Sequence, residues 1–489
     1  RLRRRRRVEF RRLMTTPNTL TDGMTTSAPP ASPSTSAVPI LVLIVLVLWQ
    51  ALNQAGAIES GDVFWHLRTG ELIIDSGIPS TDPFSWTAIG EPWQPNAWLS
   101  DVVWAALRHG FGLAAISLLR GAAVLTIALL IYWSSRRRGA GPWASVAVGV
   151  AGTLLINPFV SERPLLVGFV LFPILLAWAD DYRQGSRRAL VGAALLTALW
   201  ANLHGSFLTG VGVVGLFALG WMLEDRTWQR PVILGTTVGV AALFNPYFVS
   251  AYTHALTIRD ASVNIDEWQP LAIDDGRGVL LLVFMAAIVW AFARLNAWRT
   301  YSALLPIAFL MVGTIGVVRT GGFLVLAAAP VVALAITSLA MPRVRAWAQP
   351  RQQPIIVGLV VAGLLLAAQN IGNLADAGTV APRFSAELVA AVPSGCRLFN
   401  EYDLGGFVID ERWPDVFVSQ DGRNDMYGRE RIEQQAAWTL SDDASVLDPA
   451  GVNCVLADVD RPIAAALAAD ARWAEIGRSA GVVLMERLP

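Results

Sequence analysis

Residues 38–58 read VPILVLIVLVLWQALNQAGAI, an apolar run without a charged side chain. Its length matches the roughly 20 residues that an α-helix needs to cross a bilayer. Ten more apolar runs follow, at 112–133, 142–158, 165–180, 189–203, 206–223, 231–248, 278–293, 301–318, 321–340 and 354–371. The pattern predicts a polytopic α-helical membrane protein with about eleven transmembrane helices.

Composition agrees with a membrane protein. Of the 489 residues, 54% are hydrophobic and 16% are charged, and the mean hydropathy is +0.48. Soluble proteins carry about 25% charged residues, so an ordinary soluble enzyme is excluded. Net charge is zero overall, but the residues from Asp376 onward hold 10 Arg against 19 Asp and Glu. An acidic tail on a basic membrane body argues against nucleic-acid binding, which needs a basic groove.

Arginine placement predicts the orientation. If the N-terminus is cytoplasmic, the inner segments hold 21 Arg, whereas the outer segments before residue 372 and the spans hold seven. Because cytoplasmic loops are enriched in basic residues, we expect a cytoplasmic N-terminus. An odd number of spans then makes the C-terminal residues extracytoplasmic. Residues 1–37, of which 15–37 are rich in Thr, Ser and Pro, are predicted to be a disordered cytoplasmic leader before a transmembrane domain at 38–371.

The first outer loop, 59–100, is the longest before the tail and the most varied chemically. Apolar residues recur at helical spacing from Val63 to Ile74, which predicts an amphipathic helix on the membrane surface. Asp62 and His66 lie one turn apart and share a side of that helix. A carboxylate at membrane depth is costly and usually functional. The alternative is that Asp62 only caps the helix.

Other polar residues are also predicted at the outer face. Arg319 lies between two spans and is either an interfacial anchor or an anion ligand. Arg120 lies inside a span and must face protein or a water-filled cavity. The remaining candidates at this face are Glu162, Arg163, Asn202, His204, Glu267 and Trp268. Asp62, His66 and His204 together would suit zinc or manganese, but no spacing motif supports a site, so a divalent cation is possible and no cofactor is certain.

Residues 376–489 are predicted to form a small extracytoplasmic α/β domain. Apolar strands are expected at 396–400, 416–420, 454–459 and 481–486, with helices at Arg429–Leu440 and Pro462–Asp470. Asp421, Arg423 and Asp425 follow a strand end, where such domains bind ligands, although the same residue types form turns.

Both cysteines, Cys396 and Cys454, begin predicted strands of this domain. An oxidising compartment would permit a disulfide if the two strands are neighbours. Two buried thiols are the alternative.

Several short motifs carry a family resemblance. They are GDVFWHLRTGELI (61–73), GIPSTDPFSWT (77–87), WANLHGSF (200–207), FNEYDLGGFVI (399–409) and DGRNDMYG (421–428). With the long first outer loop and the outer C-terminal domain, the chain resembles the GT-C superfamily of integral-membrane glycosyltransferases. The likeness is to bacterial members related to the protein mannosyltransferase and aminoarabinose transferase group, and it covers roughly residues 38–489.

The resemblance implies a function and a set of roles. Such enzymes take a sugar from a polyprenyl-phosphate carrier and transfer it, with inversion, to an acceptor at the outer leaflet of the bacterial plasma membrane. Asp62 would be the catalytic base, and Arg163 and Arg319 would bind the donor phosphate. Substrate-binding roles would fall to Trp65, His66, Glu162, Asn202, His204, Glu267 and Trp268. Asp62 stands alone, without the paired acidic motif of some members. The partners implied are the lipid-linked sugar, membrane lipid and an envelope acceptor of unknown identity.

Two other functions compete with this one. A transporter is possible, but we find no inverted repeat and no broken helix pair, and charges within the spans are scarce. A non-catalytic membrane partner in cell-envelope polymer assembly or export would use the tail to bind protein.

Overall fold

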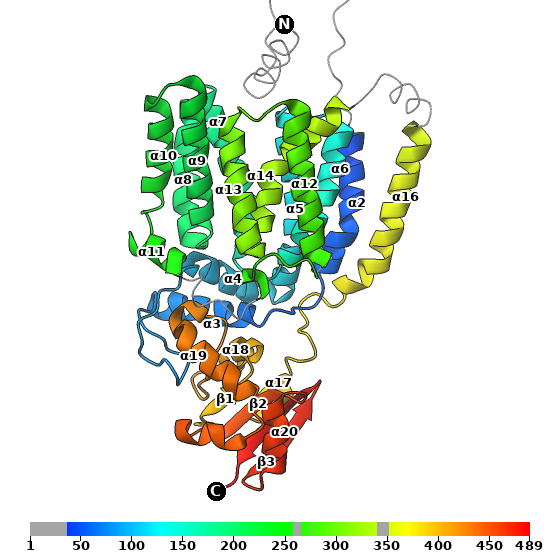
Figure 1. Ribbon diagram of the computed structural model, residues 1–489. Helices are drawn as coiled ribbons and strands as arrows, with labels where there is room; N and C mark the ends of the chain where they lie inside the picture. The colour runs from blue at the N-terminus through cyan, green and yellow to red at the C-terminus, as the bar shows by residue number, and fades with distance from the viewer. Residues whose placement is uncertain (1–36, 258–265, 275, 340–351) are drawn as a thin grey trace, which may run out of the picture.

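A computed structural model describes residues 37–257, 266–274, 276–339 and 352–489. The chain forms two parts, a bundle of long helices and a smaller C-terminal domain that contains the strands (Figure 1). Helices α3 (Asp62–Ser76) and α4 (Trp98–Phe111) lie across the end of the bundle, between the two parts. The predicted leader, 1–37, falls outside the described residues except for Ala37.

Each of the eleven segments predicted as a span contains a helix. By length and composition, seven of the described helices can each cross a membrane, and two shorter apolar helices accompany them. The chain is therefore a multi-pass membrane protein, while the count of eleven spans stays a prediction. The bundle helices are α2 (Val38–Gln54), α5 (Ala114–Arg137), α6 (Pro142–Ile156), α7 (Leu165–Arg183), α8 (Arg187–Leu203), α9 (Phe207–Asp225), α10 (Gln229–Ala241), α12 (Gly276–Leu295), α13 (Tyr301–Gly316), α14 (Gly321–Ser338) and α16 (Gln352–Asn370).

Helix α14 lies at the centre of the bundle, where every residue from Gly321 to Ala335 is buried. Its sequence is apolar on all sides, as expected for a helix that contacts protein all round. Small residues let neighbouring helices approach closely, because a Cβ added to Gly322 would lie 2.6 Å from the ring of Phe169. Helix α16, in contrast, stands at the edge of the bundle with little of its surface covered (Figure 1).

A buried ion pair explains the charge inside the second predicted span. Arg120 and Glu162 are 5% and 1% exposed, and their side chains form a salt bridge. Arg120 also donates hydrogen bonds to the carbonyl oxygens of Gln54 and Ala57. The arginine thus faces protein and ties three segments together.

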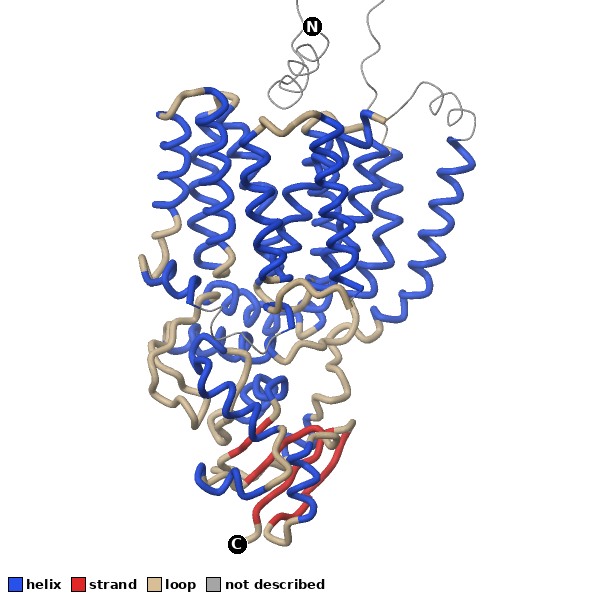
Figure 2. Tube along the Cα trace, in the orientation of Figure 1, coloured by secondary structure: helices blue, strands red, loops and turns tan. Residues whose placement is uncertain are grey.

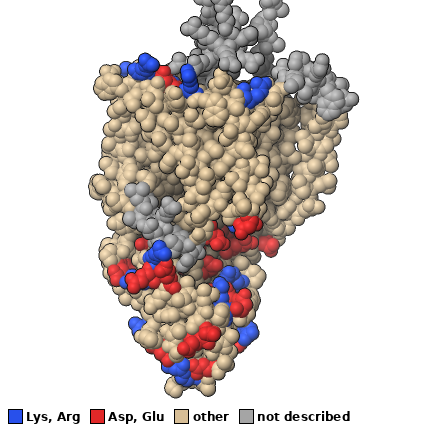
Figure 3. All heavy atoms as spheres, viewed as in Figure 1, with Lys and Arg blue, Asp and Glu red and all other residues tan. Residues whose placement is uncertain are grey.

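Basic side chains gather at the end of the bundle remote from the C-terminal domain, whereas the domain and its junction carry both signs (Figure 3). The arginines at this remote end include Arg137 at the end of α5, Arg183 at the end of α7 and Arg187 at the start of α8. This asymmetry is the one from which the orientation was predicted.

The predicted amphipathic helix exists as α3, but its environment differs from the prediction. Its apolar face packs against protein rather than lipid: Phe64 lies 5.2 Å from the ring of Phe384 and 4.9 Å from that of Phe407. The N-cap alternative for Asp62 is wrong, because Gly61 occupies the cap and no side chain caps the helix. Asp62 instead begins the first turn, where the helix dipole favours a negative charge.

The C-terminal domain contains a four-stranded sheet of order β1-β2-β4-β3 (Figure 2). Strand β1 (Leu398–Asn400) pairs parallel with β2 (Cys454–Asp458), placing Leu398 opposite Cys454; β4 (Val482–Arg487) pairs antiparallel with both β2 and β3 (Trp473–Ser479). The helical elements are α17 (Ala386–Ala390), η6 (Tyr402–Leu404), α18 (Gly405–Arg412), α19 (Asn424–Thr439), η7 (Ala444–Ala450) and α20 (Pro462–Ala469).

Two expectations for this domain need correction. Residues 416–420 form no strand of the sheet; Phe417 and Val418 make isolated bridges, to Arg397 and to Ser85 of the first outer loop. Strand β3 was not predicted, because its sequence WAEIGRS has no apolar run and only Trp473 is buried. Apolar residues at 416–418 therefore join the outer loop to the domain instead of extending the sheet.

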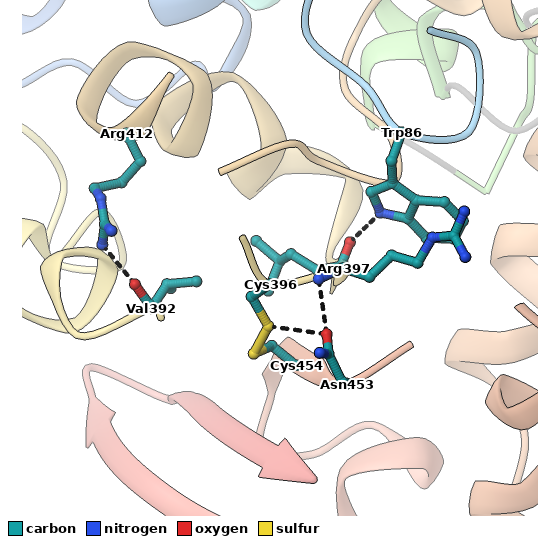
Figure 4. The surroundings of a disulfide bond; sticks show 8 residues. Trp86, Val392, Cys396, Arg397, Arg412, Asn453 and Cys454 are labelled. Carbon is teal, nitrogen blue, oxygen red and sulfur yellow. Dashed lines mark hydrogen bonds between the residues drawn. A yellow bond between two sulfur atoms is a disulfide. The ribbon is translucent and has the colours of Figure 1, made fainter. Parts of the chain in front are cut away.

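Cys396 and Cys454 form a disulfide, with Cα atoms 6.0 Å apart (Figure 4). The outer loop docks beside it. Arg397 lies over the ring of Trp86, 4.8 Å from its centroid, and Trp86 Nε1 donates to the carbonyl oxygen of Leu398 at 2.8 Å. The disulfide therefore fixes the strand that receives the outer loop.

Candidate functional site

A cavity of about 310 Å³ lies at the junction of the bundle and the C-terminal domain. Its wall combines the start of α3, the segments after α6 and α8, the turn η3 (Val318–Thr320), η6 and the start of α19. Seven of the predicted site residues line it: Asp62, Trp65, His66, Arg163, His204, Trp268 and Arg319. The fold thus brings together residues from distant parts of the sequence.

The cavity is amphipathic. Bundle helices supply the apolar part of its wall, with Leu165 of α7, Phe207 and Leu208 of α9, and Phe323 of α14. The polar part comes from the outer segments and the C-terminal domain. Such a cavity suits a ligand with a hydrocarbon portion and a charged or polar head.

Four charged side chains form one cluster in this wall. Arg163 Nε lies 2.9 Å from Asp62 Oδ2, and Arg163 Nη1 lies 2.5 Å from Glu267 Oε1. Arg319 Nε lies 3.4 Å from the other oxygen of Glu267, and its guanidinium lies over the ring of Trp268. Burial would lower the pKa of Arg163, but Asp62 and Glu267 raise it above its usual value, so this guanidinium stays charged. The formal charges of the cluster cancel.

Glycines let the C-terminal domain reach the Asp62 carboxylate. A Cβ added to Gly422 would lie 1.9 Å from Asp62 Oδ1. A Cβ on Gly61 would lie 1.9 Å from the carbonyl oxygen of Asp403, and one on Gly406 would lie 2.2 Å from the carbonyl oxygen of Gly61. Because no larger residue fits at these contacts, the motifs at 399–409 and 421–428 pack directly against Asp62 and the start of α3.

The buried carboxylate of Asp101 holds the imidazole ring of His66 in its orientation. His66 Nδ1 lies 2.6 Å from Asp101 Oδ1, and its ring stacks on Trp65. The approach depends on Gly70, since a Cβ there would lie 2.0 Å from the carbonyl oxygen of Asp101. Burial raises the pKa of Asp101, although His66 opposes the shift. A carboxylate on Nδ1 fixes the imidazole tautomer that leaves Nε2 as the acceptor.

His204 is held in the neutral state. Burial and the charge of Arg319 lower its pKa well below the usual value. Its Nδ1 accepts a hydrogen bond from the backbone N–H of Ser206 at 3.0 Å, so the proton resides on Nε2.

The pKa of His254 is shifted in the opposite direction. His254 Nε2 lies 2.8 Å from Asp425 Oδ2 and 3.4 Å from Asn96 Nδ2. Burial alone would lower the pKa of His254, but the hydrogen bond and charge of Asp425 raise it above the usual value. This pair joins α11 (Ser250–Thr257) to α19 across the cavity.

Asp421 and Arg423, two of the three candidate ligand-binding residues of the tail, form a buried ion pair that links the domain to the outer loop. Arg423 is fully buried and donates to both Asp421 oxygens and, at 2.6 Å, to Asp82 Oδ1 of the outer loop. Tyr427 Oη donates to Asp421 at 2.7 Å. Of the three candidates only Asp425 lines the cavity. The cluster locks the outer loop to the domain behind the cavity wall.

The remaining predicted residues lie behind the wall or beside it. Glu162 pairs with Arg120 and is not among the residues that line the cavity, so the structure does not support a substrate-binding role for it. Asn202 accepts from Trp98 Nε1 at 3.0 Å and donates to the carbonyl oxygen of Phe244, which likewise indicates a structural role. Glu267 contacts both Arg163 and Arg319 and is not among the residues that line the cavity. Within the described residues, no group of three or more His, Cys, Asp or Glu side chains is placed to hold a metal ion.

Sequence reasoning missed several residues of the wall. Tyr402, Asn424, Gln94 and Asn96 line the cavity without having been singled out. Burial, and then Asp62, raise the pKa of Tyr402 well above its usual value. The available signal was the position of Tyr402 and Asn424 inside the two tail motifs, whose glycines mark close backbone contacts.

Comparison with known proteins identifies the fold. The sequence matches no protein-family model and no curated protein. The archaeal oligosaccharyltransferase AglB from Archaeoglobus fulgidus, solved with an inhibitory peptide and a dolichol-phosphate, matches with a TM-score of 0.58 and 10% identity, over 87% of this chain and 69% of its own. ArnT from Cupriavidus metallidurans matches in its apo state with a TM-score of 0.55 and 14% identity, over 93% of this chain and 98% of its own.

ArnT bound to undecaprenyl phosphate matches similarly, with a TM-score of 0.53 and 14% identity, over 92% of this chain and 98% of its own. At these identities the likeness establishes the fold. The chain therefore shares its fold with AglB and ArnT.

Proposed function

We propose that this protein is a membrane glycosyltransferase that moves a sugar from a polyprenyl-phosphate donor to an extracytoplasmic acceptor, with inversion. The observation that carries the proposal is the amphipathic cavity in which Asp62 and two arginines meet beside an apolar wall. Structures of the same fold contain undecaprenyl phosphate, in ArnT, and dolichol-phosphate, in AglB. A polyprenyl phosphate has an apolar chain and a charged head, which match the apolar and the charged parts of the cavity wall.

Asp62 is the proposed catalytic base. Its carboxylate takes the proton of the acceptor hydroxyl while the acceptor oxygen forms a bond to the anomeric carbon. The bond from that carbon to the phosphate oxygen breaks, and the polyprenyl phosphate leaves with the bonding electrons. Attack opposite the leaving group inverts the anomeric centre.

Arg163 and Arg319 are the proposed phosphate ligands. Both already contact Glu267, and Arg163 also contacts Asp62, so an arriving phosphate must share them with the carboxylates. The arginines stabilise the phosphate charge that grows as the donor bond breaks. Arg163 contacts Asp62, the proposed base, and is itself a proposed phosphate ligand. Binding of the donor phosphate to Arg163 would therefore change the position of the base.

The remaining parts of the proposal concern topology. We place residues 38–371 in the plasma membrane and residues 376–489 on its extracytoplasmic side, with a cytoplasmic N-terminus. The support is the basic end of the bundle remote from the domain and the disulfide Cys396–Cys454, which suits an oxidising compartment.

The test compares wild type with Asp62→Asn in nanodiscs. Each receives a panel of radiolabelled polyprenyl-phosphate sugars and a membrane extract as acceptor pool. We expect wild type to transfer label, and Asp62→Asn to bind donor but lose transfer by at least about a hundredfold, as for removal of a general base. Asp75→Asn is the matched control, because Asp75 is exposed near the other end of the same helix.

A wild-type protein that binds and consumes none of the donors would contradict the enzyme and favour the non-catalytic assembly partner. Equal transfer by wild type and Asp62→Asn would keep the enzyme and reject Asp62 as its base. Metal analysis of the purified protein shows whether it binds a divalent cation. The transfer assay with and without a chelator shows whether activity requires one.

A further inference from the structure

We infer that the wall of the cavity formed by the first outer loop, α11 and α19 binds a hydroxyl-rich saccharide as the acceptor. This inference rests on the proposed function and specifies its second substrate. The wall contains Trp65, Gln94, Asn96, His254, Asn424 and Asp425.

The first observation is a pair of buried polar atoms without partners. Trp65 Nε1 and Asn424 Oδ1 are both buried, and neither has a hydrogen-bond partner among the described residues. Asn424 is 4% exposed, and both residues line the cavity. Buried polar groups are almost always hydrogen-bonded, so two unpartnered atoms in residues that line one cavity leave hydrogen bonds for a ligand to complete.

The second observation is the chemistry of the set. Trp65 Nε1 is a donor and Asn424 Oδ1 is an acceptor, and a hydroxyl group can satisfy both kinds. Gln94 Oε1 accepts from Ser250 Oγ at 3.4 Å, so Gln94 offers its amide N–H groups. Asn96 Nδ2 lies 3.4 Å from His254 Nε2, so Asn96 offers its amide oxygen. Asp425 offers further acceptor oxygens while holding His254. Several amides around one space match the adjacent hydroxyls of a sugar better than a single serine or threonine hydroxyl.

The third observation is where this wall stands relative to the base. Asp62 Oδ1 and Trp65 Nε1 lie 1.9 Å and 2.9 Å from the point at which a Cβ on Gly422 would stand, so they are neighbours. The other oxygen of the same carboxylate, Asp62 Oδ2, is bound by Arg163. Asp62 therefore separates the arginine cluster from this wall. Inverting transfer needs the acceptor opposite the leaving phosphate, which assigns the donor phosphate to the arginines and the acceptor to this wall.

The experiment uses the full chain in nanodiscs with a radiolabelled donor that wild type consumes. Acceptor probes are methyl glycosides of common envelope sugars and, in parallel, a serine-containing peptide. The variants are Asn424→Leu, which keeps the size and removes the amide, and Trp65→Phe, which keeps a ring and removes the N–H. Asn370→Leu, at the end of α16 away from the cavity, is the control.

We expect the KM for glycoside acceptors to rise about tenfold in Asn424→Leu and Trp65→Phe, with the Kd for undecaprenyl phosphate within twofold of wild type. Because neither atom has a native partner, both variants should unfold at or above the wild-type temperature. This combination separates a ligand-binding role from a structural one.

Three outcomes overturn the inference. An unchanged acceptor KM in both variants rejects this wall as the acceptor site while leaving the enzyme intact. A weaker Kd for the labelled sugar donor with an unchanged acceptor KM assigns the wall to the donor sugar. Transfer to the peptide but to no glycoside rejects the saccharide class. Failure of wild type to consume any donor is the distinct result that removes the proposed function as well.

Discussion

Replacing Gly422 with alanine should impair sugar transfer without unfolding the protein. The added Cβ would stand 1.9 Å from Asp62 Oδ1, whereas ordinary contact begins at 3.4 Å, so one of the two groups must move by about 1.5 Å. The backbone at residue 422 is held by its neighbour Arg423, which is fully buried and bonded to Asp82 and Asp421. The carboxylate of Asp62 is the more mobile partner and should be the one that turns away.

The expected size follows from this displacement. A shift of about 1 Å in a reacting group can cost about a hundredfold in rate. We therefore expect kcat to fall by about a hundredfold in Gly422→Ala, while the thermal unfolding temperature changes little. The measurement is transfer of labelled sugar by the nanodisc-embedded protein, with thermal unfolding recorded on the same sample.

Gly372→Ala is the control, because a Cβ there meets no atom within 4 Å. Wild-type kcat in Gly422→Ala would refute the reasoning, since it would show that the position of Asp62 next to the C-terminal domain does not matter for the reaction. A lowered unfolding temperature with an equally lowered fraction of folded protein would show instead that the loop, not the carboxylate, gives way.

Three further predictions follow from charged pairs. Arg120→Gln should lower the free energy of unfolding by about 3–5 kcal/mol, because it leaves Glu162 charged and buried without its partner; thermal unfolding in detergent measures this, and a loss under about 1 kcal/mol would contradict it. Asp425 raises the pKa of His254, so this pair's stabilisation is complete below the unfolded pKa of about 6.5 and is lost as pH rises through the folded value. Between about pH 6 and 9 the unfolding temperature should fall in wild type and fall less in Asp425→Asn. An identical pH dependence in the two proteins would show that the His254–Asp425 pair does not contribute to stability. Glu267→Gln removes the carboxylate shared by the two arginines and should tighten undecaprenyl phosphate binding about tenfold, or ~1.4 kcal/mol; equal or weaker binding would show that the arginines do not receive the phosphate.

The helices of the bundle were predictable because the bilayer sets their length and apolar character. Each predicted apolar run contains a helix, and the ends that carry arginine lie together. The sequence of α3 does not show what covers its apolar face, because an amphipathic helix has the same pattern whether lipid or protein lies against it. Only the fold shows that Phe384 and Phe407 of the tail cover Phe64.

The candidate site was partly predictable from residue types at the outer face. Asp62 was singled out because a carboxylate at membrane depth is costly, and His66, Arg163, His204 and Arg319 were candidates at the same outer face; the cavity brings them together. Their pairing was not predictable, because the contacts join segments far apart in the chain.

The tail half of the wall was not predicted for a related reason. Tyr402 and Asn424 lie in motifs whose composition also suits turns. Only the observed backbone contacts at Gly406 and Gly422 show that these motifs touch the start of α3. Glu162 was a candidate at the outer face, and the structure pairs it with Arg120 outside the cavity wall.

The shared wall also has a consequence for biosynthesis. Arg423 and Asp82, which lock the two sides of the cavity together, are 341 residues apart in the sequence. A ribosome-bound chain that has already delivered every helix of the bundle still lacks Asn424, Asp425 and the glycine that packs against Asp62. The cavity therefore gains its full set of lining residues only after the final domain has been made and docked. An unfinished chain can occupy the membrane, but its cavity still lacks the residues that the tail supplies.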